Sequence, residues 1–190
     1  MKTKRNVVIA ALGLALGTAL VLTQAAWSEK GDQPFRLEGT WMGRMTGTTT
    51  LEYTLSFSPS DPSGREASFQ VSAVEDDDPT LGGMFPDAEY ETGFMGQAVV
   101  TGPNEAAYTL PYYGMRRVGG VSQIVYIAVD SGTMRRTGPG KTEVAHYVAF
   151  YYSNQDADGN GLPDKGQAPF LCFAATTIDT RLPLLPPCKP

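Results

Sequence analysis

The segment Leu51-Glu52-Tyr53-Thr54-Leu55-Ser56-Phe57 shows the pattern that decides the fold of this 190-residue chain. Apolar side chains alternate with polar ones at every position, which is typical of a β-strand with one buried face and one face in water. A second alternating segment, Phe35–Met45, precedes it after a short link that contains Gly47. We expect these two segments to pair as a β-hairpin.

The same pattern recurs along the chain in short segments separated by turn residues. No segment shows the period of about 3.6 residues that marks an amphipathic helix. Regularly spaced short strands favour an antiparallel barrel or sandwich. The sequence therefore predicts an all-β fold, an antiparallel up-and-down barrel or sandwich of about eight strands, with strands at Phe35–Met45, Thr48–Phe57, Arg65–Val74, Tyr90–Val100, Ala106–Met115, Val121–Val129, Val144–Tyr152 and Gln167–Thr177.

Two connections between these strands are distinctive. Glu75–Ala88 is the longest irregular stretch, and it is either a functional lid or binding loop or a solvated connection. Asp130–Thr142 is basic and glycine-rich, and its composition predicts a turn between two apolar strands.

The N-terminus has the three parts of a secretory signal peptide. Three basic residues lie within residues 1–5, an uncharged run follows at Val7–Leu22, and small residues follow at 25–26. The apolar run is shorter than the roughly 20 residues that a membrane-spanning helix needs. We therefore expect residues 1–26 to be a signal peptide and 27–190 to be a single domain with a proline-rich C-terminal tail. The predicted location is secreted or periplasmic, with no stable membrane insertion after cleavage.

The charge of the chain argues against nucleic-acid binding. The net charge is −5, and removal of residues 1–26 takes away three basic residues and no acidic ones. The 15 Lys+Arg residues then become 12 against 20 Asp+Glu, a net charge of −8. A phosphate backbone requires clustered basic residues. We expect no nucleic-acid partner, and the sequence does not determine the oligomeric state.

The chain has two cysteines, Cys172 and Cys188. In an oxidising compartment a lone pair of cysteines usually forms a disulfide. A bridge would attach the proline-rich tail to the sheet, and a loop this short contributes about 3 kcal/mol in the chain-entropy model. We predict a Cys172–Cys188 disulfide.

The first strand carries Gly39-Thr40-Trp41, with Leu37 before it. This motif resembles the Gly-x-Trp signature of lipocalin and calycin barrels, in which the tryptophan closes one end of an eight-stranded barrel. An arginine on the last strand packs over that tryptophan in the family, and Arg181 is the candidate here, although it lies beyond the predicted strand. The resemblance implies a small apolar ligand in the barrel interior, contacted by Trp41, Tyr53, Phe69 and Tyr108.

The segment Gln155–Asp164 contains residues that point to a metal. Acidic and amide residues alternate with small ones, and Gly161 occupies the sixth place counted from Asp156. Calcium takes about six to eight oxygen ligands in flexible geometry, which such side chains supply. The pattern resembles the calcium loops of EF-hands, dockerins and thrombospondin type 3 repeats. The resemblance predicts a calcium site with ligands from Asp156, Asp158, Asn160, Asp164 and the carbonyl of Leu162.

This loop departs from an EF-hand in two respects. The twelfth place is Gln167 instead of the bidentate glutamate, and the flanking segments are strand-like. We therefore expect weak binding, with a Kd of roughly 10⁻⁴ to 10⁻³ M. The alternative is that these residue types are present only because they form turns well.

No motif for catalysis accompanies the single histidine, His146, which lies in an apolar strand. A histidine in this setting is more often a satisfied core residue than a catalytic base. The sequence favours a non-catalytic binding or structural protein. The alternative is an extracellular carboxylate-based hydrolase that acts on polysaccharide, for which Glu89, Glu91, Asp130 and Glu143 are available.

Overall fold

The computed structural model describes residues 35–46, 50–73 and 79–183. The predicted signal peptide and Cys188 lie outside these ranges, so both the cleavage and the disulfide stay predictions. Within the same ranges, no helix has the length and the apolar character that crossing a membrane requires.

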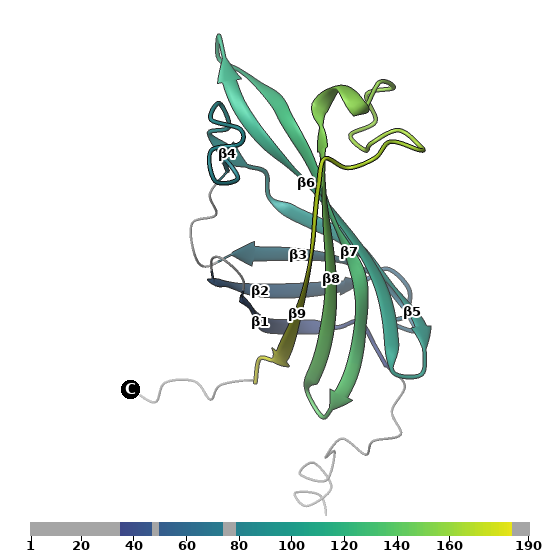
Figure 1. Ribbon diagram of the computed structural model, residues 1–190. Coiled ribbons are helices and arrows are strands. Elements are labelled where there is room, and N and C mark those ends of the chain that lie inside the picture. Colours follow the sequence, from purple (N-terminus) through teal and green to yellow (C-terminus); the bar gives the residue numbers. More distant parts are fainter. Residues whose placement is uncertain (1–34, 47–49, 74–78, 184–190) are drawn as a thin grey trace, which may run out of the picture. The chain divides into compact units, whose positions relative to one another are not determined.

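The described chain consists of β-strands and a single short 3₁₀ helix (Figure 1). The elements are β1 (Gly39–Thr46), β2 (Thr50–Pro59), β3 (Glu66–Ala73), β4 (Tyr90–Glu91), β5 (Phe94–Gly102), β6 (Glu105–Val118), β7 (Val121–Gly138), β8 (Lys141–Tyr152), the 3₁₀ helix η1 (Ser153–Gln155) and β9 (Leu171–Arg181). All strand pairs are antiparallel.

The sheet closes on itself as a barrel. Neighbouring strands follow the order β6-β5-β3-β2-β1-β9-β8-β7, and the further pairing of β6 with β7 completes the ring. The contact of β1 with β9 is short, with the register pairs Trp41–Arg181 and Met42–Thr180. The short strand β4 adds to the edge of β6. The prediction of an antiparallel up-and-down barrel is confirmed, and the eight ring strands match the expected number.

Alternating side chains explain why each strand has an inner and an outer face. On β2, Tyr53 and Leu55 are buried, whereas Glu52 and Ser56 are exposed. The hairpin of β1 and β2 pairs Met45 with Leu51 and Gly39 with Phe57, as the periodicity predicts. Burial of the apolar face is the main energetic reason for this register, because a shift by one residue would expose that face.

The prediction of a turn at Asp130–Thr142 is wrong. β7 continues to Gly138 and β8 begins at Lys141, so the reversal is confined to the residues between them. Buried side chains on this stretch, Asp130 and Met134, continue the inward-facing positions of the strand. Composition misled the prediction because glycine and basic residues occupy the strand interior and its exposed positions.

The barrel has two ends, which we name from the residues found there. β8 begins and β9 ends at the Trp41 end, and the connection from β8 to β9 forms the loop end (Figure 1). One cluster of buried side chains, which includes Trp41, Leu55 and Val144, lies toward the Trp41 end. A second cluster, which includes Tyr126, Val148 and Phe150, lies toward the loop end.

Candidate functional site

Six polar side chains lie buried inside the barrel, beside the apolar cluster at the Trp41 end, and two of them belong to that cluster. They come from five strands that are far apart in the sequence, and we call them the polar belt. On β8, His146 of the belt lies between Val144 of one apolar cluster and Val148 of the other. The members of the belt are Tyr53, Tyr108, Asp130, His146, Thr177 and Asp179.

One half of the belt is centred on Asp130 of β7. The Tyr108 hydroxyl donates to Asp130 Oδ1 at 2.8 Å and lies 2.7 Å from His146 Nδ1. The same Nδ1 lies 3.0 Å from Asp130 Oδ2. Each Asp130 oxygen therefore has a partner, as a buried carboxylate requires.

The other half of the belt is centred on Asp179 of β9. The hydroxyls of Tyr53 and Thr177 donate to Asp179 Oδ1 at 2.7 and 3.0 Å. His146 Nε2 lies 3.1 Å from Thr177 Oγ1 and so joins the two halves. The result is a continuous chain of hydrogen bonds across the interior of the barrel.

Burial changes the proton affinity of three groups in the belt. Desolvation, followed by the charge of Asp130, raises the pKa of Tyr108, and desolvation, followed by the charge of Asp179, raises the pKa of Tyr53. Both phenols therefore keep their protons and act as donors. Desolvation also raises the pKa of Asp179, against the opposing effect of its hydrogen bonds and of His146.

Two glycines leave space for the belt. Gly132 is the register partner of His146, and a Cβ there would lie 1.8 Å from the Ala145 carbonyl oxygen. Gly43 is the register partner of Tyr53, and a Cβ there would lie 2.2 Å from Asp179 Oδ1. Because any side chain at these positions would collide with neighbouring atoms, both strands need glycine here.

The order carboxylate, imidazole, hydroxyl along Asp130, His146 and Thr177 is that of an acyl-transfer triad. A nucleophile must also reach its substrate, whereas Thr177 is only 2% exposed and its hydroxyl donates to Asp179. In this geometry the chain of hydrogen bonds positions the side chains of the interior. The prediction that His146 is a satisfied core residue is confirmed.

A small pocket adjoins the belt at the Trp41 end. Its free volume is about 10 Å³, close to that of one water molecule. Apolar side chains form most of its wall, and the polar ones are few. The lining residues are Phe35, Arg36, Leu37, Trp41, Leu55, Phe57, Met134, Thr142 and Asp179.

The four residues predicted to contact an apolar ligand, Trp41, Tyr53, Phe69 and Tyr108, are all buried in the cluster at the Trp41 end. Trp41 lines the pocket, whereas Tyr53 and Tyr108 belong to the belt. Arg181, expected beyond the last strand, is instead the final residue of β9 and the register partner of Trp41.

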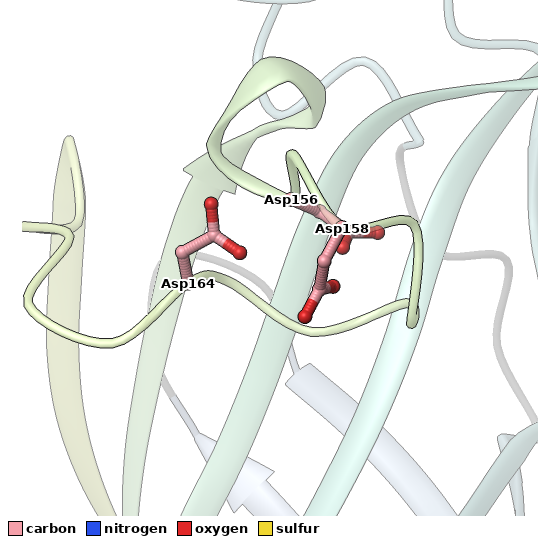
Figure 2. A group of neighbouring side chains, drawn as sticks. All are labelled: Asp156, Asp158 and Asp164. Atoms are coloured by element: carbon pink, nitrogen blue, oxygen red, sulfur yellow. The ribbon is translucent and has the colours of Figure 1, made fainter.

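The acidic loop, Gln155–Asp164, leaves the barrel at the loop end. Figure 2 shows its three carboxylates, Asp156, Asp158 and Asp164, on the turns that follow η1. One oxygen from each lies within 4.8 Å of the others. The structure therefore brings together the three acidic residues that the sequence singled out.

Backbone N–H groups hold these carboxylates in place. The N–H of Gly161 donates to Asp156 Oδ2 at 2.9 Å, and that of Ala157 donates to Asp164 Oδ2 at 3.1 Å. Asn160 uses its amide oxygen to accept from the N–H of Leu162 at 2.8 Å. Gly161 has a φ of 87°, which favours glycine and produces the sharp turn expected there.

The acidic loop also contacts the barrel wall. The hydroxyl of Tyr113 on β6 donates to the carbonyl of Gly161 at 2.9 Å. Desolvation, followed by the charge of Asp156, raises the pKa of this phenol. The carboxylates thus lie beside a strand of the barrel, and a change in their charge alters the electrostatic environment of Tyr113 on that strand.

The remaining predicted groups have different surroundings. Among the carboxylates considered for hydrolysis, Asp130 is inside the barrel, Glu143 forms an exposed ion pair with Arg135 at 2.6 Å, and Glu91 accepts from the hydroxyl of Tyr126. Cys172 is exposed on β9 and forms no disulfide with another residue that the structure describes. Its predicted partner lies outside the described ranges.

Comparison with known proteins gives no family assignment. No protein-family model matches the chain, and no curated protein matches it. A similar solved structure is that of EF1p2_mFAP2b bound to DFHBI, with 17% sequence identity over 77% of this chain and 94% of that chain. The TM-score of 0.46 is too low to carry an argument about function. The barrel assignment therefore rests on the strand pairing of this chain.

Proposed function

We propose that this protein is a non-catalytic β-barrel module whose acidic loop binds calcium. The observation that carries the proposal is the convergence of oxygens from Asp156, Asp158 and Asp164 within 4.8 Å of one another. Three negative charges this close repel one another, and a divalent cation would remove that repulsion. The net charge of this cluster makes an anionic ligand unfavourable.

Other oxygens of the loop can complete the coordination. The amide of Asn160 and the carbonyl of Leu162 lie on the same turn, and water supplies further ligands in weak calcium sites. Only three carboxylates take part, so we expect a Kd of roughly 10⁻⁴ to 10⁻³ M. Such an affinity suits the calcium-rich exterior to which the predicted signal peptide would direct the protein.

The proposed role of calcium is structural. The acidic loop joins β8 to β9, and the hydrogen bond from Tyr113 to Gly161 links it to β6. An ion that neutralises the carboxylates would hold this connection in one conformation and keep the loop end of the barrel ordered. A ligand that binds only the folded state stabilises it by RT ln(1 + [L]/Kd).

The test is the thermal midpoint of the mature chain, residues 27–190, in millimolar calcium and in chelator. We expect calcium at ten times its Kd to stabilise the wild type by about 1.4 kcal/mol. The double substitution Asp156→Asn/Asp158→Asn is expected to abolish this increment. Glu105→Gln, an exposed change elsewhere, is the matched control and keeps it. Identical midpoints with and without calcium in the wild type would show that the loop is a turn only.

A second candidate function is the binding of a small apolar ligand. The pocket at the Trp41 end favours it, because apolar side chains line most of its wall and Asp179 offers one hydrogen-bond acceptor. Its free volume of about 10 Å³ means that a ligand must displace part of the wall. The segment Phe35–Leu37 belongs to no strand, and we expect it to be the part of the wall that moves when a ligand enters.

Titration with a fluorescent apolar probe tests this second candidate. We expect one saturable site in the mature chain. Leu55→Trp fills the pocket and is expected to reduce binding, whereas Val99→Trp, on an exposed position of β5, is expected to leave it unchanged. Equal binding by both variants would place the probe on the surface.

A further inference from the structure

Within the part of the chain that the structure describes, one buried hydroxyl of the barrel has no hydrogen-bond partner. Thr142 of β8 is 3% exposed, and its Oγ1 is without a partner among the described residues. A buried polar group in this state destabilises the folded protein relative to a satisfied one. Because most buried polar groups are paired, this exception calls for a partner from outside the chain.

The hydroxyl of Thr142 shares its pocket with a carboxylate that has spare accepting capacity. Thr142 and Asp179 both line the pocket at the Trp41 end. The hydrogen bonds of Asp179 in the described part of the chain go to Oδ1, from Tyr53 and Thr177. A carboxylate has about four acceptor positions, so Oδ2 can accept more. Asp179 is 2% exposed, so bulk solvent has little access to it.

The size of the pocket restricts what can pair with both groups. Its free volume is about 10 Å³, and a water-sized guest needs about 10–15 Å³ together with two to four polar partners. Thr142 and Asp179 supply two such partners. Of the two charged residues that line the pocket, Asp179 is buried whereas Arg36 is exposed, so a guest that donates hydrogen bonds is favoured over an anion.

We propose that Thr142 Oγ1 and Asp179 form an internal binding site for one small hydrogen-bond donor of the size of water. The guest donates hydrogen bonds to Asp179 Oδ2 and to Thr142 Oγ1, which extends the polar belt by one member. Two donors share this chemistry and size, a water molecule and an ammonium ion. The site is independent of the acidic loop at the other end of the barrel.

Thr142→Val tests the site because valine has nearly the shape of threonine and lacks the hydroxyl. If the guest is present, the variant removes one of its two partners, and we expect the thermal midpoint to fall by about 2–4 °C. Thr180→Val, on an exposed position of β9, is the matched control and is expected to change little. An unchanged or higher midpoint in Thr142→Val overturns the proposal, since removing an unpartnered hydroxyl from a dry pocket is neutral or stabilising.

The salt used in the melts distinguishes the two guests. Ammonium chloride and tetramethylammonium chloride at equal ionic strength screen charges alike, but tetramethylammonium is too large and donates no hydrogen bond. A higher midpoint in ammonium for the wild type and for Thr142→Ser, absent in Thr142→Val, identifies ammonium as the guest. Equal midpoints in the two salts, together with the lower midpoint of Thr142→Val, identify water. A high-resolution crystal structure with no density between Thr142 and Asp179 overturns the proposal.

Discussion

The polar belt and the acidic loop both gather carboxylates, but they satisfy them in opposite ways. In the belt, Asp130 and Asp179 accept mainly from side chains on other strands, 16 to 126 residues away in the sequence, and Asp179 also accepts from Thr177, two residues away on its own strand. In the loop, carboxylates accept mainly from backbone N–H groups two to seven residues away. The belt is therefore a product of the closed barrel, whereas the loop forms locally.

Exposure to solvent widens this difference. Asp179 is nearly inaccessible, while Asp158 is exposed. A carboxylate in a low-dielectric interior depends on each partner, because water does not replace a lost one. A carboxylate in water loses little when a partner is removed. Substitutions in the belt should thus have large effects on folding stability. The contribution of the loop to stability should depend chiefly on bound cations.

The largest effect is expected for His146→Ala. The change removes the partner of Asp130 Oδ2 and the link to Thr177, and it leaves a cavity. Removal of one partner of a buried pair costs about 3–5 kcal/mol. Urea unfolding of the variant and of Tyr147→Ala, the exposed neighbour on β8, measures it. Equal losses of unfolding free energy in the two variants would show that the buried hydrogen bonds of the belt contribute no more to stability than an exposed side chain does.

A smaller loss is expected for Gly43→Ala, which adds one methyl group beside the belt. The new Cβ would lie 2.2 Å from Asp179 Oδ1 and 2.4 Å from the ring of Tyr53, so these side chains must move. Overpacking of this kind costs about 1–3 kcal/mol. Gly93→Ala is the control, because a Cβ there meets nothing within 4 Å. If both variants unfold at the same urea concentration, the side chains around Gly43 accommodate a methyl group without loss of stability, and the belt is not tightly packed.

The same contrast explains what the sequence predicts. The acidic loop is recognisable because all its candidate ligands lie within ten residues, and β2 is recognisable from its alternation. The belt escapes prediction because Asp130 falls in a segment whose composition indicates a turn, and because Tyr53 meets Asp179 only when β1 pairs with β9. A weak signal is present: Thr177 and Asp179 occupy alternate, inward positions of one strand.

The pH dependence of stability tests the charge of the belt. The pKa of Asp179 in the folded protein is raised above its ordinary value of 3.8. The folded state then holds a proton that the unfolded state has released, so stability falls as pH rises from about 3.8 through the raised value. The slope is at most about 1.4 kcal/mol per pH unit.

Asp179→Asn removes this titrating group. We expect the difference in unfolding free energy between wild type and variant to become less favourable to the wild type as pH rises from about 3 to 7. Thr180→Val, an exposed change on the same strand that adds and removes no charge, is the control and should leave the profile unaltered in this interval. A difference that is constant with pH would contradict the raised pKa.

The smallest effect is expected in the acidic loop when calcium is absent. Asp158→Ala removes an exposed acceptor for the N–H of Asn160, but Asp156 Oδ1 still accepts from the same N–H at 3.0 Å. Loss of one of three clustered negative charges also reduces repulsion, so we expect a change within about 0.5 kcal/mol in chelator. The same substitution in millimolar calcium should lose most of the calcium-dependent increment. A large loss in chelator alone would mean that the loop, like the belt, supports the barrel through its own hydrogen bonds, and the contrast between the two regions would then lie in sequence distance and not in the energy they contribute.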